Sequence, residues 1–72
     1  MRKNRRIAAH RVLLENGKIS RFCVVELEDG LVTSCFPLTH EIEHTEWMSG
    51  DIILKRDIEG GLRAFHNDMM IE

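Results

Sequence analysis

Two histidines and two glutamates lie within five residues, His40-Glu41-Ile42-Glu43-His44, and this stretch is the first candidate for chemistry in the chain. On a helix, His40 and His44 would share one face and could bind one zinc ion, with Glu41 beside the metal-bound water as general base. The same letters fit the inverted pattern, in which Glu43 is the base. A metal-binding protein or zinc-dependent hydrolase is therefore one alternative for the function.

The surroundings of this stretch favour another interpretation. Pro37 precedes it and Ser49-Gly50 follows it, which leaves room for a helix of only about two to three turns. We therefore favour a solvated connection that holds no catalytic residue, metal or cofactor, and we expect Trp47 to anchor it against the core. Possible third ligands have no distinctive spacing: Glu46, Asp51, Glu59 and His66.

Several β-prone segments surround this connection. Residues 7–14 predict a strand that ends at the Asn16-Gly17 turn, although Ala8 and Val12 also fit one stripe of a helix. Residues 51–55 predict a strand with apolar contacts on both faces, and residues 62–66 predict another after Glu59-Gly60-Gly61.

A hairpin is predicted for residues 21–38, where Asp29-Gly30 separates two β-prone runs. A two-residue turn places Leu27 opposite Val32, Val25 opposite Ser34 and Cys23 opposite Phe36, which gathers apolar residues on one face. In this register the two cysteines are not opposite each other. We therefore expect Cys23 and Cys35 to be free thiols.

These elements predict a mainly-β fold. The expected architecture is a small five-stranded meander that forms an open barrel or half-sandwich, with a short helical turn or loop around residues 39–48. Residues 7–72 form the single domain, and residues 1–6 form a basic flexible arm. The chain has no export signal and no apolar run of about 20 residues, which favours a cytoplasmic location.

The charges are unevenly distributed. Residues 1–11 carry five positive charges and no acid, whereas the remainder carries five basic and twelve acidic side chains. An acidic body does not attract nucleic acid, so only the arm offers weak nucleic-acid contact as a further alternative. Its basic side chains are Arg2, Lys3, Arg5 and Arg6.

The leading hypothesis is a non-enzymatic module that acts by self-association or by binding a protein. A 72-residue chain has little core, and unpaired edge strands readily pair with a second copy. Three apolar residues near the C-terminus, Met69-Met70-Ile71, either cover the core or contact another subunit. We therefore expect a homodimer, formed through edge strands or these residues.

Two resemblances complete the interpretation. Residues 7–14, followed by residues 24–32, resemble the opening β-segment of amidohydrolases, but this chain lacks the catalytic barrel and its His-x-His pair, so no activity is implied. The whole chain, with Phe36-Pro37-Leu38-Thr39 and Thr45-Glu46-Trp47, also resembles small uncharacterised bacterial proteins. That second resemblance implies a compact β-rich domain.

Overall fold

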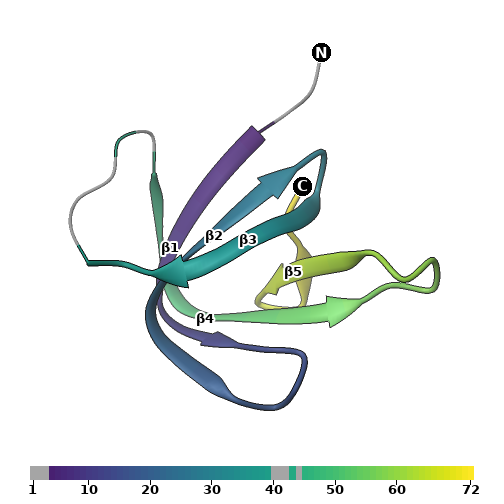
Figure 1. The fold of residues 1–72 in the computed structure, drawn as a ribbon, viewed down its shortest axis with the longest axis horizontal. Helices are drawn as coiled ribbons and strands as arrows, with labels where there is room; N and C mark the ends of the chain where they lie inside the picture. Colours follow the sequence, from purple (N-terminus) through teal and green to yellow (C-terminus); the bar gives the residue numbers. More distant parts are fainter. Residues whose placement is uncertain (1–3, 40–42, 44) are drawn as a thin grey trace.

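Six strands form one mixed sheet that curls into a half-barrel (Figure 1). The computed structural model describes residues 4–39, 43 and 45–72, and no helix occurs among them. The strands lie in the order β3-β2-β1-β4-β5-β6. Their bounds are β1 (Asn4–Leu13), β2 (Ile19–Glu28), β3 (Leu31–Pro37), β4 (Glu46–Arg56), β5 (Leu62–His66) and β6 (Met69–Met70).

The expected β-rich half-open architecture is confirmed, but the predicted five-stranded meander is wrong. β1, β2 and β3 form one antiparallel unit, and β4, β5 and β6 form a second. Parallel pairing of β1 with β4 joins the two units, so β1 lies in the middle of the sheet. Turn signals report only pairs of neighbouring strands, which is why the sequence did not indicate this long-range pairing.

Three short turns connect neighbouring strands through residues with the left-handed backbone that tight hairpins need. The predicted turn at Asn16-Gly17 lies in a three-residue loop, which the hydrogen bond from Leu14 N to Lys18 O closes over 2.8 Å and in which Gly17 has a φ of 87°. The predicted turn at Asp29-Gly30 is also confirmed, with φ values of 51° and 82°. Asn67-Asp68 forms the third, with φ values of 53° and 64°, and it was not predicted.

The β4–β5 turn, predicted at Glu59-Gly60-Gly61, is organised by Asp57. Asp57 Oδ1 accepts hydrogen bonds from the backbone N–H groups of Glu59 and Gly61, over 2.9 and 2.8 Å. Asp57 Oδ2 pairs with Arg63 Nε over 3.0 Å. The Arg63 side chain, followed by the Gly61 backbone, holds the pKa of Asp57 below its usual value.

A β-bulge changes the predicted register between β2 and β3. Leu27 lies opposite Val32 as expected, but the register then shifts by one residue. Val25 therefore faces Cys35 instead of Ser34, and Cys23 faces Pro37 instead of Phe36. A bulge leaves one extra residue on one strand, so the turn alone does not fix the pairing beyond it.

A second group of backbone irregularities, in β1, β2 and β4, lies where β1 and β2 change direction (Figure 1). The β1–β4 register shifts between Ala9 and Arg11, and Gly50 of β4 has φ 94°. On β2, Phe22 has φ 51° in the middle of a strand, a conformation that bulky side chains rarely adopt. Bulges bend strands and increase their twist, which accounts for the curled sheet.

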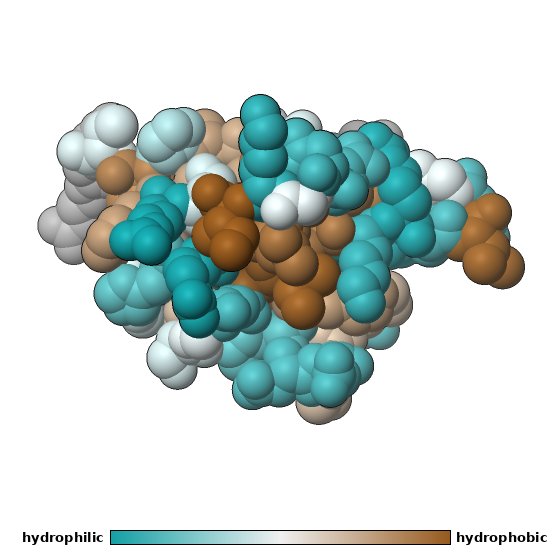
Figure 2. Space-filling model, turned by 90° about the horizontal axis from the view of Figure 1, so that it is seen from below, coloured by the Kyte–Doolittle hydropathy of each residue, from teal (hydrophilic) through white to brown (hydrophobic). Residues whose placement is uncertain are grey.

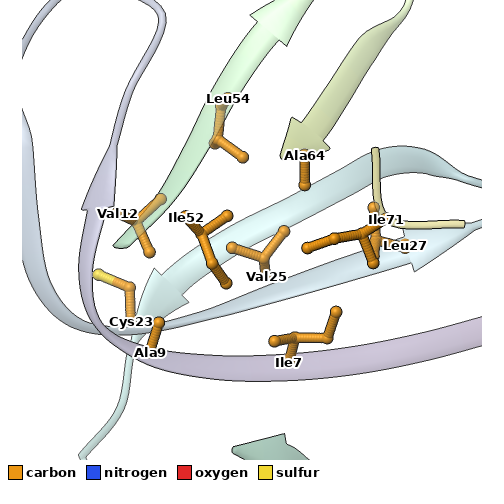
Figure 3. Close-up of a cluster of buried hydrophobic side chains, with 10 residues drawn as sticks. All are labelled: Ile7, Ala9, Val12, Cys23, Val25, Leu27, Ile52, Leu54, Ala64 and Ile71. Atoms are coloured by element: carbon orange, nitrogen blue, oxygen red, sulfur yellow. The ribbon is translucent and has the colours of Figure 1, made fainter. Parts of the chain in front are cut away.

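Buried apolar side chains from β1, β2, β4 and β5 meet inside the curl (Figure 3). Residues of β1 and β2 face those of β4 and β5, and Ile71, beyond β6, reaches the same cluster. The three apolar residues near the C-terminus therefore differ in burial: Ile71 is buried in the core, whereas Met69 and Met70 are exposed. The core residues are Ile7, Ala9, Val12, Cys23, Val25, Leu27, Ile52, Leu54, Ala64 and Ile71.

Candidate interaction face

The histidine-rich stretch is only partly described. His40, Glu41, Ile42 and His44 lie outside the described residues, so the zinc hypothesis stays a prediction. Glu43 is exposed, and its carbonyl oxygen accepts a hydrogen bond from Arg6 Nη1 over 2.9 Å. The expected helical turn or loop ends earlier than residue 48, because β4 begins at Glu46.

Three of the possible third metal ligands have other partners. Glu46 forms an ion pair with Arg5, and Asp51 forms one with Arg11, each with a closest distance of 2.9 Å. His66 Nε2 lies 2.7 Å from the carbonyl oxygen of Ser49. Within residues 4–39, 43 and 45–72, no three His, Cys, Asp or Glu side chains come together as a metal site.

Residues 4–6 of the predicted basic arm belong to β1. There the guanidinium groups of Arg5 and Arg6 bind the carboxylates of Glu46 and Glu26. The hydrogen bond to Glu46 raises the pKa of Arg5. Two of the four charges proposed for nucleic-acid contact are therefore used within the fold, and Arg2 and Lys3 lie outside the described residues.

The most distinctive surface feature is a row of apolar side chains on the outer face of the sheet. Each member is directly paired with the next across neighbouring strands, from β2 through β1, β4 and β5 to β6. Side chains alternate between faces along a strand, so the row lies opposite the core residues Val12, Ile52 and Leu54. We call it the outer row; its members are Ile19, Leu13, Ile53, Phe65 and Met70.

The outer row is partly exposed and unevenly covered. Ile19 and Met70 at its two ends are 59% and 45% exposed, and the three side chains between them are partly buried. A shallow hollow of about 90 Å³ lies between Leu13, Ile19 and Ile53 and the Arg11–Asp51 pair. Seen from below, the molecule presents apolar side chains gathered in one patch with hydrophilic side chains around it (Figure 2).

Charged residues border the outer row on both sides. On one side, Arg11 Nε and Nη2 bind the two carboxylate oxygens of Asp51 over 2.9 and 3.1 Å, and Arg21 is paired with Arg11 across the strands. On the other side, Lys55 Nζ lies 5.7 Å above the ring centroid of Phe65. An apolar centre with a charged rim is the usual anatomy of a protein–protein interface.

An aromatic cluster joins β1, β2 and β4. The His10 ring makes edge-to-face contacts with Phe22 and Trp47, at centroid distances of 5.1 and 4.8 Å. Phe22 is 51% exposed and Trp47 is 48% exposed, so the prediction that Trp47 anchors against the core is wrong. A left-handed backbone at Phe22 costs on the order of 1–3 kcal/mol, and here it presents an aromatic ring to solvent.

The sequence predicted only part of the outer row. The prediction that residues 51–55 make apolar contacts on both faces is confirmed, since Ile52 and Leu54 point into the core and Ile53 points outward. The other members of the outer row became recognisable only with the strand pairing. The described residues contain no helix of the length and apolarity that crossing a membrane requires.

Comparison with known proteins adds no assignment. The chain matches no family model, no curated protein and no solved structure. The resemblances to the amidohydrolase β-segment and to small bacterial proteins therefore stay predictions.

Proposed function

We propose that this chain is a non-enzymatic interaction module that binds a second copy of itself through the outer row. The observation that carries the proposal is the register, which sets one apolar side chain from each of five neighbouring strands in a continuous line. Packing against another apolar surface would remove this line from water and add stability that a small core lacks.

Charge placement favours a second copy as the occupant. A two-fold axis in the contact plane between the copies, parallel to the sheet and perpendicular to the row, reverses the row, so that Ile19 of one copy lies towards Met70 of the other. The same operation brings exposed Arg21, on β2, towards exposed Asp68, in the β5–β6 turn. Opposite charges at the rim of an interface favour the correct register more than they add affinity.

The expected dimer is weak. Fully burying an isoleucine or phenylalanine contributes roughly 1.5–3 kcal/mol, and the members of the row are already partly covered. Association costs about 4–15 kcal/mol in lost translational and rotational freedom. We therefore expect a dissociation constant in roughly the micromolar range instead of the nanomolar range.

Sedimentation equilibrium tests the proposal. Across protein concentrations from about 1 to 500 µM, the average mass should rise from one chain towards two, with the midpoint in the micromolar range. A mass that stays at one chain throughout would rule out self-association. A mass that continues to rise beyond two chains would rule out a closed two-fold pair.

A further inference from the structure

The two cysteines lie on one wall of a hollow at the open end of the half-barrel. The β2–β3 bulge sets Cys35 opposite Val25, two residues along from Cys23, so both thiols share the inner side of the sheet. The hollow has a volume of about 310 Å³. Apolar side chains form much of its lining, including Leu14, Leu54 and Leu62.

The two thiols interact with each other and with a hydroxyl group. Ser20 Oγ lies 2.7 Å from the sulfur of Cys23, which is buried. Cys35 remains accessible from solvent. Partial burial, with smaller effects of the charge and the hydrogen bond of Cys23, raises the pKa of Cys35 to about 11. At neutral pH the Cys35 thiol is therefore protonated and a poor nucleophile.

The diagonal placement does not suit a disulfide. Diagonal neighbours on antiparallel strands have Cα atoms about 7–8 Å apart, whereas a disulfide needs Cα atoms closer than about 7 Å and Cβ atoms about 3.5–4.5 Å apart. Two sulfur atoms that approach each other from diagonal positions can instead share one metal ion, since metal–sulfur bonds are about 2.3 Å long.

We propose that Cys23 and Cys35 bind one soft monovalent metal ion, Cu(I), between their sulfur atoms. Both thiols lose a proton, each sulfur donates an electron pair to the metal, and no electron is transferred. Bound Cu(I) and the two released protons thus lower the net charge of the protein by one. Thiolates are soft ligands that select Cu(I), and several apolar side chains line the hollow around them.

The number of ligands favours Cu(I) over zinc. Structural zinc is bound by four protein ligands, and catalytic zinc by three. Among the described residues, no third His, Cys, Asp or Glu side chain joins the two thiols as a metal site. Monovalent copper accepts two sulfur ligands in a linear arrangement. The Ser20 hydroxyl is a positioning group that holds the Cys23 sulfur.

Competition for Cu(I) under argon tests this site. The native chain should remove one equivalent of Cu(I) from its bicinchoninate complex, and Cys35→Ser should bind at least about 100-fold more weakly. Cys35 is solvent-accessible, so this variant is expected to fold, which circular dichroism checks. His40→Ala combined with His44→Ala is the control and should retain native affinity.

Several results would overturn the site. Equal Cu(I) binding by the native chain and Cys35→Ser would mean adventitious binding only. Loss of Cu(I) binding in the double histidine variant would mean that the site lies in the stretch of residues 40–44 instead. Binding of half an equivalent of Cu(I) per chain would mean that two copies share one ion. Because binding releases a proton from each of the two thiols, apparent affinity should rise steeply with pH, by up to about 100-fold per pH unit, and a flat profile would contradict thiolate binding.

Discussion

Replacing Ile52 with alanine is expected to lower the free energy of unfolding by about 2–5 kcal/mol. Ile52 is fully buried on β4, in the middle of the cluster shared by both halves of the curled sheet (Figure 3). A 72-residue domain has a total stability of roughly 4–11 kcal/mol, so this single cavity would remove a large share of it. Urea unfolding followed by circular dichroism measures the change.

Ile58→Ala is the matched control for this core substitution. Ile58 lies in the β4–β5 turn and is fully exposed, at 103% of the reference area. Its truncation removes no packed atoms, so the free energy of unfolding should change by less than about 0.5 kcal/mol. Equal effects of the two substitutions would mean that Ile52 is not in the core.

Ile19→Glu is expected to weaken dimerisation by at least about 100-fold. The substitution places a carboxylate at one end of the outer row, where pairing with a second copy would remove it from water. Ile19 is 59% exposed in the single chain, so the fold should be little affected. Sedimentation equilibrium measures the change in dissociation constant.

Ile58→Glu provides the control for this surface substitution. It makes the same chemical change on the same residue type, but at the tip of the β4–β5 turn instead of on the outer row. Its dissociation constant should match that of the native chain within about twofold. If both glutamate variants weakened association equally, net charge and not the outer row would govern it.

Local features of the fold were predictable from the sequence. Turns occur at Gly17 and at Asp29-Gly30, as expected, because glycine, aspartate and asparagine tolerate a left-handed backbone better than other residues. Residues 62–66 match β5, strand propensity also located β1 to β3 within a few residues, and the strand predicted at residues 51–55 is the second half of β4. In each of these cases, neighbouring residues in the sequence determine the outcome.

Features that depend on distant residues were not predictable. The pairing of β1 with β4 joins segments about 40 residues apart, and no turn signal reports it. The β2–β3 bulge brings Cys35 opposite Val25, although the turn at Asp29-Gly30 alone predicts Ser34 there. Trp47 was placed in a connection because of its neighbours, yet it belongs to β4 and is half-exposed.

The outer row also has a part that was predictable from the local sequence and a part that depends on distant residues. Ile53 was recognisable as a residue of a strand with two apolar faces. Its partners Leu13 and Phe65 come from strands far away in sequence, so the continuity of the outer row emerges only from the register. The histidine pair at residues 40 and 44, the strongest pattern in the sequence, lies outside the described residues and remains a prediction.

Amide chemical shifts recorded during dilution test the central claim most directly. From about 500 to 10 µM, the signals of Leu13, Ile19, Ile53, Phe65 and Met70 should move together along one binding curve, while that of Ile58 stays fixed. The row spans five strands, so a common curve would identify it as the contact surface. Shifts confined to β3, at the edge of the sheet, would indicate edge pairing instead and would contradict an interface through the outer row.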